Sequence, residues 1–404
     1  MVSLIKDSVG ILPAGALGVS FFYHLTKQLT QVDDQVYFLE RQNSSSSQVL
    51  KKSGEIAIAK RCYVRGASCR EAQIATSETI KYFPTAKILK PDLLSCYKLA
   101  FLPEIVLICP NPDQLLSIIS TIVELLILIS EQGELSQPEL PFPYLVLSSN
   151  GIYFQRFRQI FIEKIEEATL FGRLNDLWPD IMPRIVSRFL RGVTIQTGVR
   201  EGSEGNTIYR PGPRGRTQIT GGDITSRERC CEILAGKGAW FELAPNISPT
   251  RIEFDKALAN LSTNLLGQLM SIDAQGKFKV LTVGEILANS HQPEIRELAS
   301  HVFKVGQMIK VYGKDENLEV ILDQLMETCH AHESHIPSSL QWVDTKIRLL
   351  TLEPEMTPTE AWLLEPLIRY AKASELEDSV NYFESLKNQL RELHRMIDPM
   401  IRER

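Results

Sequence analysis

Residues 8–25 read SVGILPAGALGVSFFYHL, and this stretch decides the fold of the amino-terminal part of the chain. The apolar run from Ser8 to Leu12 predicts a buried strand, and the apolar spacing from Ala16 to Leu29 predicts a helix. A second strand is predicted at Gln35 to Leu39 (QVYFL). Strand, turn, helix and strand in this order form a βαβ unit, the building block of a parallel sheet covered by helices.

The turn between the first strand and the helix is similar to a dinucleotide-binding glycine motif, G-x-G-x-x-G. The first glycine of that motif allows a tight turn, the second lets a pyrophosphate approach the backbone, and the third lets the helix pack on the strand. Here Pro13 stands first, Gly15 and Gly18 fill the other two places, and Ala16 and Leu17 lie between them. Because proline holds φ at about −65°, it cannot adopt the angles open to glycine. The turn alone leaves both a dinucleotide site and an ordinary strand-to-helix turn open.

Two charged residues follow the second strand and indicate different cofactors. Glu40 lies about twenty residues beyond the glycines, where an acidic side chain accepts hydrogen bonds from the ribose 2′-hydroxyl of NAD. Arg41 carries a planar donor fork that suits the 2′-phosphate of NADP. A solvated charge pair at the end of a strand is the third interpretation.

The remaining α/β features lie before residue 249. Strands are predicted at Glu104 to Cys109 and Tyr144 to Ser148, with a long helix from Pro112 to Ser130 between them. The segment Gly192 to Gly222, rich in Gly, Thr and Arg, predicts short strands joined by turns. We expect solvated loops at 43–48 (NSSSSQ) and at the polar segment 131–143.

Beyond the Pro245 to Thr250 segment (PNISPT), almost every stretch has helical periodicity. We therefore expect an α/β fold in which residues 1–248 form a Rossmann-type dinucleotide-binding domain with a β-rich appendage, and residues 249–404 form an all-helical substrate and catalytic domain. The predicted helices of the second domain cover 251–272, 283–289, 293–311, 316–328, 359–373 and 376–397.

A row of polar side chains marks the first of these helices. Lys256, Asn260 and Asn264 are each four residues apart, so a helix places them on one face. One ammonium and two carboxamides provide a proton donor and two neutral hydrogen-bonding groups for a polar substrate. A polar face bonded to neighbouring backbone is the alternative.

These motifs, in this order, resemble the ketopantoate reductases (2-dehydropantoate 2-reductases) of the 6-phosphogluconate-dehydrogenase-like superfamily, of which the chain looks like a divergent member. The resemblance rests on Gly15-Ala16-Leu17-Gly18, Arg41, Ser149-Asn150-Gly151, the Gly/Thr-rich stretch and the lysine-asparagine row. It implies that NADP is the cofactor, with its 2′-phosphate on Arg41 and its nicotinamide facing Asn150. Glu40 keeps NAD open.

The resemblance also implies a reaction, the reduction of a small 2-keto acid, with ketopantoate giving pantoate. Hydride would come from the nicotinamide and a proton from Lys256, whose charge stabilises a growing oxyanion and whose pKa burial can lower. Ser338 resembles the serine that binds the substrate carboxylate. Glu360 resembles the acidic residue that orients the lysine or binds a substrate hydroxyl. Asn260 and Asn264 would hold the remaining polar groups of the substrate.

Several departures keep other hypotheses open. Besides Pro13, the chain has Pro110-Asn111-Pro112 where the family commonly has a lysine, and it carries insertions at 131–143 and 273–280. These differences leave room for a different 2-keto or 2-hydroxy acid as substrate. They also leave room for a nucleotide-binding regulatory protein that has lost turnover.

Composition argues against other classes of function. The formal net charge is −5, and 23% charged with 44% hydrophobic residues is typical of a globular protein without the basic excess of nucleic-acid binders. The apolar run from Leu115 to Ile129 is shorter than a membrane span and predicts a buried helix.

The seven cysteines form no C-x-x-C pair, which predicts reduced thiols in the cytosol. We expect no metal site, despite the histidines at 330, 332 and 335, and leave a homodimer open.

Overall fold

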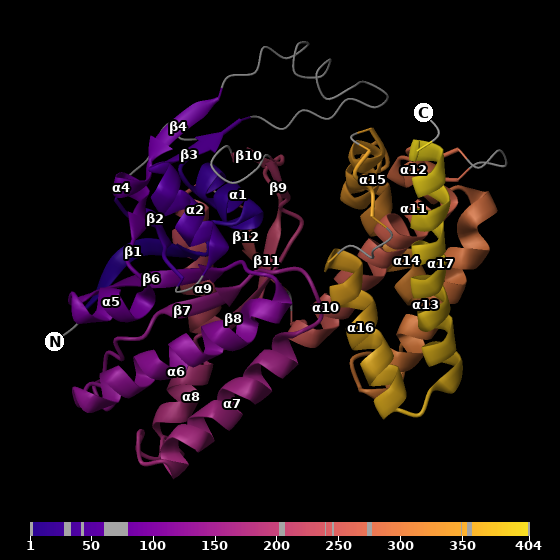
Figure 1. The fold of residues 1–404 in the computed structure, drawn as a ribbon. Helices are drawn as coiled ribbons and strands as arrows, with labels where there is room; N and C mark the ends of the chain where they lie inside the picture. Colours follow the sequence, from indigo (N-terminus) through magenta and orange to yellow (C-terminus); the bar gives the residue numbers. More distant parts are fainter. Residues whose placement is uncertain are drawn as a thin grey trace. The chain divides into compact units, whose positions relative to one another are not determined.

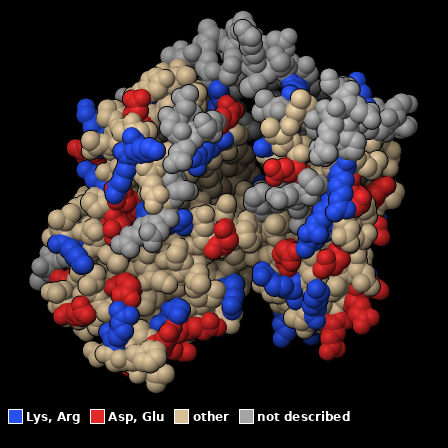
Figure 2. Space-filling model, in the orientation of Figure 1, with Lys and Arg blue, Asp and Glu red and all other residues tan. Residues whose placement is uncertain are grey.

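A computed structural model gives the structure of the chain. It describes residues 3–27, 34–41, 44–59, 80–201, 207–238, 240–244, 246–272, 277–348, 350–353 and 358–402. The described residues form two compact units, with the boundary between Pro249 and Thr250. On the face shown in Figure 2, the acidic and basic side chains are intermixed rather than gathered by sign.

An eight-stranded sheet organises the first unit, in the order β12-β11-β8-β7-β6-β1-β2-β5 (Figure 1). All neighbouring strands are parallel except β8 and β11, which are antiparallel. The parallel majority agrees with the predicted Rossmann-type architecture. The strands are β1 (Ser3–Leu12), β2 (Val36–Leu39), β5 (Leu89–Lys90), β6 (Phe101–Ile108), β7 (Tyr144–Leu147), β8 (Phe189–Thr194), β11 (Thr217–Gly221) and β12 (Phe241–Leu243).

Hydrophobic layers cover both faces of this sheet. One layer contains apolar side chains of α5 (Leu93–Lys98), α6 (Leu115–Glu131), α7 (Phe154–Leu170) and α8 (Ile181–Val186). The other contains those of α1 (Ala16–Leu25) and α9 (Ile224–Gly236). Successive β1 residues alternate between the layers, with Ile11 in the second and Leu12 in the first, because neighbouring strand side chains point to opposite faces.

Helix α6 is the apolar segment predicted to be buried. With the preceding η1 turn (Pro112–Gln114) it forms a stretch that is long and apolar enough to cross a membrane, with a mean hydropathy of 1.8. Nine of its side chains, among them Ile119 and Leu125 at 0% exposure, are buried against the sheet and its neighbouring helices. It therefore packs as a core helix of the first unit.

A second, four-stranded sheet was not predicted. Its order is β4-β3-β10-β9, with β3 (Glu55–Ile58), β4 (Lys81–Pro84), β9 (Gly198–Glu201) and β10 (Ile208–Pro211). The Gly/Thr-rich stretch is thus divided between two sheets, since β8 and β11 join the large one. Gly198 lies so close to α1 that a Cβ at this position would be 2.4 Å from the carbonyl oxygen of Ala16. A glycine is required there because the backbone of β9 contacts the first turn of α1.

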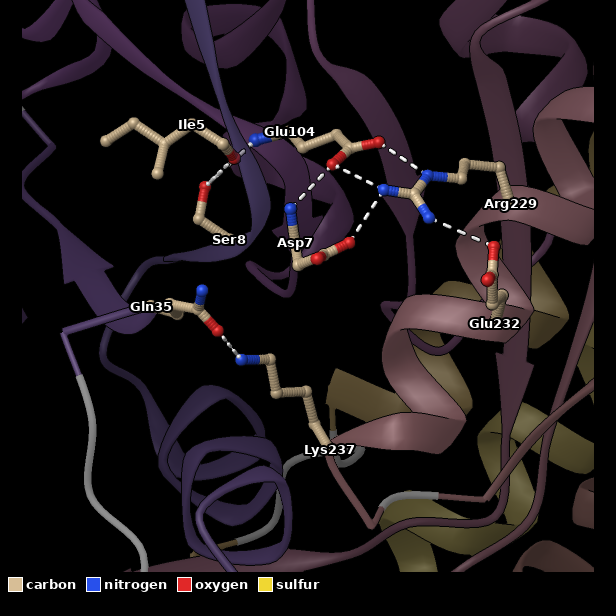
Figure 3. A network of polar contacts seen from close by, with 8 residues as sticks. All are labelled: Ile5, Asp7, Ser8, Gln35, Glu104, Arg229, Glu232 and Lys237. Atoms are coloured by element: carbon tan, nitrogen blue, oxygen red, sulfur yellow. Dashed lines mark hydrogen bonds and ion pairs between the residues drawn. The ribbon is translucent and has the colours of Figure 1, made fainter.

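An ion-pair network fastens α9 to the large sheet (Figure 3). Arg229 donates to both carboxylate oxygens of Glu104, at 2.7 and 3.0 Å, and to Asp7 at 2.7 Å and Glu232 at 3.0 Å. The backbone N–H of Asp7, whose φ is 57°, donates to Glu104 at 2.7 Å. The network therefore holds the irregular register of β1 between Ile5 and Val9 against β6.

The second unit is helical, as predicted. Its small cores join buried side chains of different helices, such as Val343 with Leu390 and Ile286 with Leu340. The helices are α10 (Pro249–Asn260), the π-helical turn η2 (Leu261–Leu265), α11 (Leu266–Met270), α12 (Val283–Ile286), η3 (Asn289–His291), α13 (Gln292–Met308), α14 (Leu318–His330), α15 (Ser338–Arg348), α16 (Pro358–Ala373) and α17 (Glu377–Arg402).

One predicted loop is wrong, and a second is a loop that is less exposed than predicted. The serine run at 43–48 enters helix α2 (Ser45–Ser53). Ser44 and Ser47 are buried, and the Ser47 hydroxyl accepts a hydrogen bond of 3.1 Å from the backbone N–H of Arg41. The segment 131–143 is partly packed, since Leu140 and Phe142 are buried and Glu134 accepts a hydrogen bond of 3.0 Å from the Tyr97 hydroxyl. Of the second insertion, residues 273–276 lie outside the described residues.

Candidate functional site

The glycine turn opens helix α1 at the carboxyl end of β1. A Cβ on Gly18 would lie 2.2 Å from the Pro13 carbonyl oxygen, so the turn itself requires this glycine. Gly15 is different, because a Cβ there would meet nothing within 4 Å and its φ of −86° suits any residue. The space beside Gly15, at a helix end with no side-chain cap, suits a pyrophosphate bound by the N–H groups of the first turn. The turn therefore fits a dinucleotide, although Pro13 replaces the first glycine.

The two charged residues after β2 have different environments. Glu40 forms a 2.6 Å ion pair with Lys51 of α2, which offsets the negative charge of the carboxylate. The Nε of Arg41 is buried and has no hydrogen-bond partner within the described chain. Burial lowers the pKa of Arg41, opposed by the charge of Asp113. An arginine donor left without a partner suits an incoming anion, because a buried donor without a bond costs free energy.

Asn150 lies in the turn that follows β7. Its side chain is exposed, while the flanking Ser149 and Gly151 are buried. Ser149 donates its hydroxyl to the carbonyl of Pro110, which joins this turn to the residues after β6. Gly151 has a φ of 125°, a region that favours glycine. Asn111, where the family commonly has a lysine, is exposed at the start of η1.

Lys256 lies one turn before the end of α10 and is partly buried. Burial lowers the pKa of its amine to about 8, opposed by the nearby thiol of Cys329. An amine with a pKa near neutrality can both donate and accept a proton in water. Asn260, one turn later, is also partly buried and ends α10.

The helix predicted through this row is present but irregular, because residues 261–265 form a π-helical turn that follows Asn260 and contains Asn264. A π turn breaks the regular hydrogen-bond ladder and commonly occurs at functional sites. Here the Asn264 carbonyl accepts from Gln268 Nε2 at 3.0 Å and from the Ser339 hydroxyl at 3.1 Å. Gln268 Oε1 in turn lies 3.2 Å from Nε2 of His394 in α17. Side-chain donors thus bind the Asn264 carbonyl where the regular backbone hydrogen bonds are interrupted.

Ser338 and Ser339 begin α15 and meet Asn264. The Asn264 side-chain oxygen accepts from the Ser339 N–H at 3.2 Å, the Ser339 hydroxyl at 2.9 Å and the Ser338 hydroxyl at 3.4 Å. Because these donors occupy Oδ1, the amide group Nδ2 faces acceptors: it donates to the Thr263 hydroxyl at 3.5 Å and has a second N–H for another acceptor. The structure therefore brings the predicted pair Asn264 and Ser338 together and adds Ser339, whose role no sequence pattern predicted. Glu360 lies in α16, but its side chain is outside the described residues.

Other reactive side chains have ordinary surroundings. Cys96, Cys109, Cys230, Cys231 and Cys329 are free thiols, and burial raises the pKa of Cys231 and Cys329 to about 11. Cys62 and Cys69 lie outside the described residues. Across the part of the chain that the structure describes, no three His, Cys, Asp or Glu side chains gather as a metal site would require. His330 instead contacts the Met326 carbonyl at 2.7 Å.

No protein-family model matches the sequence, and no curated protein resembles it significantly. Solved structures do resemble the fold. The ternary structure of D-mandelate dehydrogenase with NADH and anilino(oxo)acetate has a TM-score of 0.58 at 13% identity, over 97% of this chain and 99% of that one. A probable 2-dehydropantoate 2-reductase from Bacillus subtilis has a TM-score of 0.55 at 14% identity, over 96% of this chain and 99% of that one.

The chain has the ketopantoate reductase fold. A dimeric ketopantoate reductase from Staphylococcus aureus matches too, with a TM-score of 0.54 at 13% identity over 96% of this chain and 99% of that one. At such identities the likeness concerns the fold alone, and function has to be argued from the residues of this chain.

Proposed function

We propose that this chain is an NAD(P)H-dependent reductase of a small 2-keto acid, with ketopantoate as the leading substrate and pantoate as the product. The observation that carries the proposal is Lys256, a partly buried lysine whose amine has a pKa lowered to about 8 and which two carboxamides follow. The ketopantoate reductase fold and the open glycine turn support it. A lone lysine on a packed helix costs free energy, so its burial calls for a role.

The site residues would divide the work. When bound, a reduced nicotinamide would supply the hydride for the 2-keto carbon. Lys256 stabilises the negative charge that develops on the substrate oxygen and then gives a proton to this alkoxide. Asn264, with its oxygen occupied by Ser339, donates through Nδ2 to an acceptor oxygen of the substrate. Asn260 and Ser338 bind the remaining hydroxyl and carboxylate oxygens, and Glu360 orients Lys256 or binds a substrate hydroxyl.

We propose NADP rather than NAD as the preferred cofactor. The unpartnered Nε of Arg41 would donate to a 2′-phosphate, and Lys51 removes much of the repulsion that Glu40 would exert on it. In the turn before α1, the N–H groups would bind the pyrophosphate beside Gly15, Ala16, Leu17 and Gly18, and Asn150 would face the nicotinamide. A D-mandelate dehydrogenase of the same fold was crystallised with NADH, so NADH belongs in every assay.

The first experiment follows the absorbance of NADPH, and then NADH, after ketopantoate is added to the protein. Lys256→Ala should abolish oxidation of the cofactor. Lys279→Ala is the matched control, because this lysine lies in the same unit and its side chain is 59% exposed beside Glu285. No cofactor oxidation by the native protein with any 2-keto acid, or full activity of Lys256→Ala, would overturn the proposal.

A different 2-keto acid is the second candidate substrate. Its support is Asn111, an uncharged and exposed side chain after β6, at the place where the family commonly has a lysine. A neighbour with the same fold holds anilino(oxo)acetate, a 2-keto acid derivative with an aromatic group. A panel of aliphatic and aromatic 2-keto acids separates the two candidates by the ratio of kcat/KM.

We further propose a cytosolic protein with reduced thiols, which agrees with the free cysteines of the described chain. Because a neighbour of the same fold is dimeric, we also propose a homodimer. Light scattering of the purified protein gives its mass directly. A value near 45.7 kDa at micromolar concentration would contradict the dimer.

A further inference from the structure

Arg191 is a buried cation beneath the turn that carries Asn150. It lies in β8, opposite Leu147 of β7 and Thr220 of β11, and only 2% of it is exposed. Removing a guanidinium from water is costly unless its donors are bonded. The bonds of Arg191 therefore indicate what this arginine holds in place.

The guanidinium donates to backbone carbonyls on both sides of Asn150. Nη2 donates to the carbonyls of Ser149 at 2.8 Å and Gly151 at 3.3 Å. Nη1 donates to the carbonyls of Leu147 at 2.7 Å and Gly192 at 2.9 Å. One side chain thus ties the end of β7, the turn and β8 together.

Tyr153 reinforces the same turn. Its ring lies 4.6 Å from Cζ of Arg191, close enough for a cation–π contact. Its hydroxyl donates to the Ser149 carbonyl at 3.2 Å, so that carbonyl is held by two residues. The guanidinium of Arg191 and the hydroxyl of Tyr153 therefore both hold the turn in place.

This arrangement decides which groups the turn presents. In a trans peptide the C=O and the following N–H point in opposite directions. Because the carbonyls of Ser149 and Gly151 face the guanidinium, the N–H groups of Asn150 and Ile152 point away from it. The exposed side chain of Asn150 belongs to the same outward surface. At the exposed Asn150 the turn then offers hydrogen-bond donors near a fixed positive charge, an arrangement that suits an acceptor oxygen.

We propose that Arg191 is a positioning residue for hydride transfer, holding residues 149–151 so that Asn150 meets the reacting end of the dinucleotide. The inference rests on the proposed function and extends it to a residue that sequence patterns assign only to a strand. Lysine cannot substitute fully, since one ammonium cannot take the places of both Nη2 at the turn and Nη1 at the carbonyls of Leu147 and Gly192.

The test compares Arg191→Met with Arg188→Met. Arg188 precedes the same strand, stacks on Tyr144 at 5.1 Å and donates to the carbonyls of Leu140 and Phe142, which come before β7. Both variants should lose stability. Only Arg191→Met should slow single-turnover hydride transfer, by about 100-fold, with little change in the Kd for NADPH, because a small misplacement of the reacting groups is enough. Arg191→Lys should not restore the rate.

A double-mutant cycle separates positioning from a general loss of structure. If Arg191 acts through the turn, Asn150→Ala should slow the native protein but add little to Arg191→Met. Additive losses, an unchanged hydride-transfer rate in Arg191→Met, or an equal loss in Arg188→Met would each overturn the proposal.

Two further measurements keep the outcome clear. If Arg191→Met does not fold, Tyr153→Phe removes the hydroxyl that donates to the Ser149 carbonyl and should slow hydride transfer about fivefold. An unchanged rate would then overturn the inference.

If the native protein binds NADPH but reduces no 2-keto acid, the proposed function is wrong while the inference about Arg191 can still be tested. The emission of bound NADPH then tests the turn, and it should differ from the native value in Arg191→Met but not in Arg188→Met. Equal emission would overturn the inference, as would a native protein that binds no dinucleotide.

Discussion

The side-chain oxygen of Asn264 accepts a hydrogen bond of 2.9 Å from the hydroxyl of Ser339, a residue 75 positions later in the chain. The backbone N–H of Ser339 donates to the same oxygen at 3.2 Å. An amide group can face either way, and these donors decide its orientation. Asn264 is therefore set as a hydrogen-bond donor toward its surroundings.

Ser339→Ala should consequently raise the KM for the 2-keto acid and lower stability by about 1–3 kcal/mol, the usual cost of breaking a buried hydrogen bond. Ser338→Ala should raise KM without this loss, since Ser338 makes only a 3.4 Å contact with Asn264. Steady-state kinetics and urea denaturation measure both quantities. Equal stability of the two variants would contradict the assigned orientation.

Gly15→Ala and Gly18→Ala should separate nucleotide binding from folding. A methyl group on Gly15 meets nothing within 4 Å, so the thermal midpoint should stay unchanged while NADPH affinity falls. A methyl group on Gly18 would lie 2.2 Å from the Pro13 carbonyl, so this variant should unfold at lower temperature. Thermal denaturation with and without NADPH distinguishes them. Undiminished NADPH affinity in Gly15→Ala would argue against a pyrophosphate at this turn.

Arg41→Met should weaken NADPH binding roughly 10- to 100-fold and leave NADH binding nearly unchanged, because a charged hydrogen bond to the 2′-phosphate is lost. Lys51→Met should act in the same direction, since it frees the Glu40 carboxylate from its 2.6 Å ion pair. Arg173→Met is the control, because Arg173 has an exposed side chain that forms an ion pair with Glu124. A parallel loss for both cofactors would contradict a 2′-phosphate site.

The rate of 2-keto acid reduction should depend on pH through Lys256. With its pKa lowered to about 8, the amine is protonated and able to donate below pH 8 and loses this ability above it. Reduction should therefore slow as pH rises through about 8, and oxidation of the 2-hydroxy acid should accelerate. Pre-steady-state rates of reduction from pH 6 to 10 test this decrease. If the rate of Lys256→Ala decreases over the same pH range, the decrease belongs to the titration of another group.

The sequence by itself determined the elements whose signals are local. The glycine turn, the strands beside it and the apolar helix α6 follow from periodicity over a few residues, and the structure places β1, α1 and β2 at or near their predicted positions. The lysine-asparagine row was equally visible, because residues four apart share a helix face.

Tertiary structure decided the rest. Strands β9 and β10 pack on α1 and belong to a separate sheet. Ser339 of α15 donates to the carbonyl of Asn264 within the π turn. Ser339 and Arg191 could not be singled out from their neighbours in sequence, because their partners lie 75 and about 40 residues away. Local sequence determines the conformation that a segment prefers in isolation. The orientation of a functional side chain depends on hydrogen-bond donors from distant segments, which reach it only after the chain has folded.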